Sequence, residues 1–139
     1  MSDPLGALVA ALLADAPTAA IAGTDVFGGE LSPDVLARMP TSAILLVPSG
    51  GVSLTGGSGA EVDGQRVDLF AFAGTPGDAN RLRATAARRL QMIEREVFAG
   101  TLIHWVNRAG GFALARDRDG QWPQAFQSFQ VFYSFKEIE

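Results

Sequence analysis

The chain of 139 residues contains no cysteine and only one histidine. The absence of cysteine excludes disulfides and thiolate metal sites, and it agrees with a reducing cytosol without proving one. A single histidine weakens any interpretation as a Ser-His-Asp hydrolase or as a histidine metal cluster. That residue, His104, stands inside the apolar stretch TLIHWVN. We therefore expect a packed or hydrogen-bonded imidazole in a strand rather than a general base.

Motifs for nucleotide binding, acyl transfer and calcium binding are also lacking. No glycine-rich run ends in Gly-Lys-Ser/Thr or has dinucleotide-binding spacing. Ser58 lies in a glycine-rich run, but Ala60 breaks the spacing of a nucleophile elbow. Asp117 and Asp119 resemble the start of a calcium loop, yet Ser128 stands where the bidentate Glu is required, so a β-turn is favoured. We predict no catalytic, cofactor-binding or metal-binding residue, and no enzyme activity.

Long hydrophobic runs and an excess of positive charge are absent as well. The apolar segment 5–13 is too short to span a bilayer, and the residues before it carry no positive charge, so we expect a soluble, non-exported chain without membrane contact. The net charge of −4 argues against a generic nucleic-acid binder, because phosphate is neutralised mainly by Lys and Arg. With 47% apolar and 19% charged residues, the composition is globular.

The pattern of apolar residues predicts an α+β fold in a single domain, 1–139. Capping pairs such as Asp3-Pro4 and Thr75-Pro76 predict the starts of helices, whereas period-two alternation of apolar residues predicts strands. We expect a mainly antiparallel sheet of four to five strands, with a long helix (about 76–98) and an N-terminal helix (about 4–14) packed on one face. The smaller elements expected are a short helix after Asp15, a short helix from 33, strands at 26–27, 43–47, 62–73, 101–107 and 112–115, and turns at 110–111 and 117–120.

The last fifteen residues, AFQSFQVFYSFKEIE, form the strongest strand signal in the chain. Their aromatic residues alternate with polar ones, and neither Pro nor Gly interrupts them. This pattern indicates a C-terminus that is tied into a sheet or that augments the sheet of a neighbour.

Two further features suggest contacts with partners. Residues 48–60 hold five glycines and predict a flexible loop or arm, including Gly56, Gly57, Ser58 and Gly59, that becomes ordered on assembly. Arg81, Arg88 and Arg95 are seven residues apart and would share one face of the long helix, with Arg83 and Arg89 flanking it. Taken alone, this face is best explained as solvated and partly paired with Glu94 and Glu96. The alternative is a charged subunit interface or a surface toward nucleic acid.

With these elements in order, the chain resembles the tail terminator (tail completion) family of long-tailed bacteriophages and gene-transfer-agent-like particles. The resemblance covers nearly the whole chain and rests on pattern. Its parts are the capped N-terminal helix with its Ala-rich continuation to Gly23, and the short strand Val26-Phe27. The later parts are AILLVPSGG, GQRVDLFAFAGTPGDANRLRATAARRL and GGFALARDRDGQWPQAFQSFQVFYSF.

The resemblance implies a structural virion protein that assembles in the host cytoplasm and resides in the tail or neck. Members form a ring, usually a hexamer, that caps the head-proximal end of the tail tube, ends tube polymerisation and joins the head connector. The implied partners are further copies of the chain, the tail tube protein and the head-closure or connector protein. DNA would pass through the ring lumen without sequence-specific binding.

Other functions remain open from the sequence. One is another neck protein, either head-closure or adaptor. A second is a small-molecule or peptide-binding α+β domain, whose pocket between sheet and helices would be lined by Trp105, Trp122 and Tyr133. A divergent hydrolase or transferase is the least favoured, because the chain has a single histidine.

Overall fold

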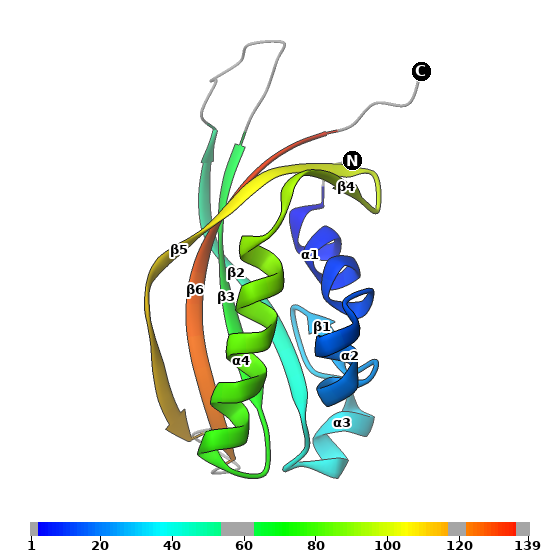
Figure 1. Ribbon diagram of the computed structural model, residues 1–139, viewed down its shortest axis with the longest axis vertical. Coiled ribbons are helices and arrows are strands. Elements are labelled where there is room, and N and C mark those ends of the chain that lie inside the picture. Colours follow the sequence, from blue (N-terminus) through cyan, green and yellow to red (C-terminus); the bar gives the residue numbers. More distant parts are fainter. Residues whose placement is uncertain (1–2, 54–62, 117–121, 136–139) are drawn as a thin grey trace.

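The computed structural model describes residues 3–53, 63–116 and 122–135. One curled sheet is covered on one face by helices (Figure 1). Its strand order is β1-β2-β3-β6-β5-β4, with β1 parallel to β2 and the other pairs antiparallel. The elements along the chain are α1 (Pro4–Leu13), α2 (Ala16–Ala22), β1 (Val26–Gly28), α3 (Pro33–Arg38), β2 (Ala43–Ser53), β3 (Asp63–Phe72), α4 (Pro76–Gln91), β4 (Glu94–Phe98), β5 (Thr101–Arg116) and β6 (Pro123–Phe135).

The core lies between the sheet and the helices α1 and α4. Alternate residues of each strand face the helices, as the two-residue period of a strand requires. Val67 and Leu69 of β3 and Phe129 and Val131 of β6 are buried there with Leu82 of α4. α4 packs on β3, β5 and β6, and α1 packs on β1, β2, β4 and β5 as well as on α4. The expected α+β class, with both helices on one face, is confirmed.

The long helix is shorter than predicted, and the sheet has six strands rather than four to five. α4 ends at Gln91, and residues 94–98 form β4 instead of its last turns. β4 pairs with β5 through a two-residue turn in which Ala99 and Gly100 both have positive φ (50° and 81°). Such a turn fits the twist of a hairpin, so pairing with β5 overrides the helical spacing of Ile93 and Val97.

Two predicted breaks in the sheet are not breaks. Gly110 and Gly111 were expected to form a turn, but β5 continues from Thr101 to Arg116 and accommodates them where its register shifts between Arg108 and Phe112. The predicted loop 48–60 begins inside β2, which runs to Ser53 with a register shift between Pro48 and Gly50. Gly56, Gly57, Ser58 and Gly59, and the expected turn at 117–120, lie outside the described residues.

The C-terminal strand is central in the sheet. Over its described length β6 pairs with β3 on one side and with β5 on the other. The hypothesis that it augments the sheet of a neighbour is therefore wrong, because both of its edges are already occupied within the chain. The expectation that the C-terminal segment is tied into a sheet is confirmed for residues 123–135, and residues 136–139 lie outside the described residues.

Within the described residues, no single helix has the length and hydropathy needed to cross a membrane; α1 and α2 meet that test only in combination, across a bend of 85°.

Candidate functional site

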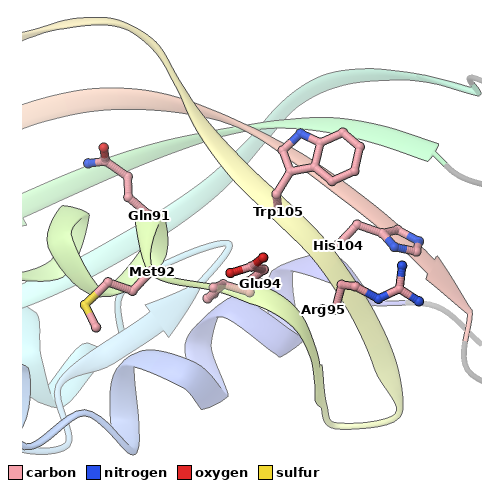
Figure 2. A pocket seen from close by; sticks show the side chains of 7 residues that line it. Gln91, Met92, Glu94, Arg95, His104 and Trp105 are labelled. Carbon is pink, nitrogen blue, oxygen red and sulfur yellow. The ribbon is translucent and has the colours of Figure 1, made fainter.

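His104 lies at the end of an open hollow of about 530 Å³ beside β4. The hollow is lined by Gln91, Met92, Ile93, Glu94, Arg95, His104 and Trp105. Figure 2 shows Arg95 and His104 at one end and Gln91 and Met92 at the other. His104 Nε2 lies 3.0 Å from Ser134 Oγ, and the indole of Trp105 stacks near Phe132 with ring centres 4.9 Å apart. The predicted hydrogen-bonded imidazole in a strand is confirmed.

The hollow is lined by a mixture of polar and apolar side chains. Its polar groups are one imidazole, one guanidinium, one carboxylate, one amide and the indole N–H of Trp105, and none of its lining residues carries a hydroxyl or a thiol. Trp105 and Met92 are both exposed. Within residues 3–53, 63–116 and 122–135, no group of three or more His, Asp or Glu side chains is placed to hold a metal ion.

The pKa of His104 is lowered from its ordinary value of 6.5 by burial and then by the positive charge of Arg95. A lowered pKa means that the folded protein favours the neutral ring, so this residue's contribution to stability is lost as the pH falls below 6.5. We expect an NMR titration of the His104 ring to show a midpoint below 6.5, and Arg95→Gln to raise it. Arg38→Gln is the control, because Arg38 is paired with Asp25 on another part of the fold. A midpoint unchanged by Arg95→Gln would contradict this electrostatic account.

The helix-free face of the sheet is rich in aromatic residues. Side chains alternate between the two faces of a strand, and Leu69 and Phe129 face the helices, so Phe70 of β3 and Phe126 of β6 lie on the helix-free face. Their ring centres are 5.1 Å apart. Phe72 and Trp122 form an edge-to-face pair with ring centres 6.4 Å apart. A second hollow, of about 350 Å³, joins this face to the β1 edge and is lined by Gly29, Glu30, Leu31, Leu36, Leu45, Phe72 and Trp122.

The hypothesis of one ligand pocket between sheet and helices, lined by Trp105, Trp122 and Tyr133, is wrong in its geometry. The two tryptophans line separate hollows, one beside β4 and one beside β1. Tyr133 instead packs against the core. The space between sheet and helices is filled by apolar side chains.

Arg81, Arg88 and Arg95 do not share a helix face. Arg81 and Arg88 belong to α4, but Arg95 stands in β4 with φ 52°, because the helix ends before it. Arg88 forms an ion pair with Asp15 of the same chain, with Nη2 3.0 Å from Oδ2. The participation of Arg81, Arg88 and Arg95 in an interface stays a prediction, although they do not share the helix face on which it was based. The expected pairing with glutamates holds for Arg89, which lies 3.4 Å from Glu96.

Arg83 is the residue whose position the sequence interpretation missed. It was taken to flank a solvated face, yet it is buried and contacts β5 and β6. Its position does carry a signal: Arg83 lies four residues after Ala79 and four before Ala87, and both are buried against the sheet. Residues four apart on a helix share a face, so Arg83 belongs to the buried stripe.

Of the comparisons with known proteins, only the one with solved structures gives a match, and it concerns the fold. No protein-family model matches the chain, and no curated protein matches it. Among solved structures, it is similar to a chain of the structure described as "Virion of native gene transfer agent (GTA) particle", with a TM-score of 0.74 and 15% identity. The likeness covers 94% of this chain and 93% of that chain. This chain therefore shares, over almost its whole length, the fold of a chain from a gene transfer agent virion.

Proposed function

We propose that this protein is a structural virion protein that acts as a tail terminator. In this role a ring of copies, a hexamer by the family resemblance, caps the head-proximal end of the tail tube, stops its growth and joins the head connector. The observation that carries the proposal is the fold shared, end to end, with a chain of a gene transfer agent virion. The resemblance of the sequence to tail terminators points to the same role independently.

The surface of the molecule supports a role in assembly rather than catalysis. Large apolar side chains are exposed on several elements, among them Leu36, Trp105, Phe112 and Leu114. Phe112 and Leu114 are neighbours on β5, whereas Leu36 lies on α3 at the opposite side of the sheet, and exposed apolar patches of this kind are typical of protein contacts. The partners we propose are further copies of the chain, the tail tube protein and the head-closure protein, with DNA passing through the lumen. The site of action is the tail or neck of the particle, assembled in the host cytoplasm.

Removing the gene from the element that encodes it tests this function directly. Without a terminator, tube growth has no stop, so we expect tail tubes of excessive and variable length that carry no heads. Negative-stain electron microscopy of the particles gives the length distribution, and the gene supplied in trans is the control. Tails of normal length without heads would instead identify a head-closure or adaptor protein.

Purified protein tests the ring separately. At high concentration, or with tail tubes added, native mass spectrometry and electron microscopy should show a closed oligomer at tube ends. A head-to-tail contact whose rotation closes leaves no free surface, which is why a ring is expected rather than a range of sizes. A protein that remains monomeric under both conditions would overturn the proposal.

A further inference from the structure

Arg83 is a buried cation whose contacts with the described residues include no carboxylate. Its side chain is 8% exposed, Nη1 donates to Gln127 Oε1 (2.6 Å), and Nε donates to Asn80 Oδ1 (2.9 Å). Its guanidinium lies 4.1 Å from the centre of the Phe112 ring. All these partners are uncharged, and none of the ion pairs formed by the described residues includes Arg83. Arginine is rarely buried without an anion, yet no carboxylate of residues 3–53, 63–116 and 122–135 pairs with this one.

A second arginine adds to the same positive region. Burial, and then the charge of Arg108, lower the pKa of Arg83. Arg108 of β5 is exposed and stands opposite Phe129 in the register with β6. Phe129 faces the helices, so Arg108 lies on the helix side of the sheet together with Arg83. Two cations therefore share one lateral border of the molecule.

This border is an open strand edge. β4 covers β5 only as far as Trp105, and within the described residues no strand pairs with the outer edge of β5 beyond that point. In Figure 1 this part of β5 forms the left boundary of the molecule. Phe112 and Leu114 are 51% and 50% exposed there. A long apolar strand edge without a cover is the kind of feature that pairs with another chain.

The opposite border has the complementary character. There β1 is the edge strand, and Glu30 and Asp34 follow it, both exposed. Neither forms an ion pair among the described residues. Leu36, 44% exposed, lines with Glu30 the apolar hollow of about 350 Å³ that includes Leu31. One border thus offers exposed apolar side chains beside cations, and the other offers an apolar hollow beside carboxylates.

We propose that a second copy of this chain docks its Glu30 border onto the β5 edge of the first. Phe112 and Leu114 enter the hollow beside Leu36, and Glu30 supplies a carboxylate to Arg83 and Arg108. Because the two patches lie on different edges of one molecule, the contact is head-to-tail, and a docked pair keeps one free patch of each kind, the Glu30 border of one copy and the β5 edge of the other. The inference rests on the proposed ring and names the contact that builds it.

Charge reversal on each border tests the contact. We expect Arg108→Glu and Glu30→Arg each to weaken self-association about tenfold or more, since each places like charges opposite one another. The double variant Arg108→Glu/Glu30→Arg restores opposite charges and should recover most of the loss. Sedimentation velocity over a concentration series, with wild-type tail tubes added where they are needed for assembly, measures the association.

Arg66→Glu is the matched control, because Arg66 is an exposed arginine of β3, a strand in the interior of the sheet. It changes the net charge as Arg108→Glu does and should leave association unchanged. Far-UV circular dichroism and thermal unfolding verify that each variant is folded, as expected at exposed positions. If the wild type forms a ring and either single reversal assembles equally well, or if the double variant does not recover, this contact is wrong while the proposed function stands. A wild type that never associates overturns both.

Discussion

Replacing Phe129 by alanine is expected to lower the free energy of unfolding by about 3 to 5 kcal/mol. Phe129 is fully buried on β6, between β3 and β5, and it packs within the core beneath the helices. The substitution deletes a ring that is fully shielded from water. It leaves a cavity that the flanking strands cannot collapse to fill, because β6 is paired on both sides. Urea unfolding of the monomer, followed by far-UV circular dichroism, measures the loss.

Phe132→Ala is the control on the same strand. Phe132 lies on the opposite face of β6, is half-buried, and stacks on Trp105 with ring centres 4.9 Å apart. Truncating a half-exposed ring loses less buried area and leaves no closed cavity, so we expect a loss below about 2 kcal/mol. Equal losses for the two variants would show that β6 does not bury one face against the helices.

Enlarging Ala11 to leucine is expected to lower the free energy of unfolding by about 1 to 3 kcal/mol. Ala11 is fully buried on α1, and α1 packs against both α4 and the sheet. Its small side chain allows this close approach, so three added carbons must displace a neighbouring element. The same urea series measures the change.

Ala14→Leu provides the comparison within the same helix. Ala14 is the exposed residue that caps the C-terminal end of α1, so a leucine there reaches solvent. We expect its free energy of unfolding to stay within about 0.5 kcal/mol of the wild type. If Ala11→Leu changed the free energy of unfolding as little as Ala14→Leu, α1 would not be in close contact with the rest of the fold.

Helix starts could be predicted from the sequence because their signals are local. Asp3, Asp15, Ser32 and Thr75 each accept a hydrogen bond from the backbone N–H three residues later, as their types and the prolines that follow them indicated. An N-terminal cap depends only on the residues of the first helical turn. The short strand β1 was predicted at 26–27 for a similarly local reason, and it is confirmed.

Strand partners depend on distant residues, and there the prediction failed. Ile93 and Val97 have helical spacing, but β5 supplies partners that only the folded chain brings near. Gly110 and Gly111 suggest a turn, yet β6 holds both flanking segments of β5 in one strand. The same holds for Arg83. Its guanidinium is held by a hydrogen bond to Gln127, 44 residues away, and no spacing within α4 reveals that contact.

The short length of β4 has a mechanical consequence. Because β4 begins at Glu94, which pairs with Trp105, the outer edge of β5 has a step at that residue. For a copy docked as proposed beside Phe112 and Leu114, the start of β4 would act as a stop along the strand direction. Such a stop would fix the axial rise between successive copies by backbone geometry as well as by the fit of side chains. If every contact returns its neighbour to the same height, the assembly has no pitch and cannot grow into a spiral.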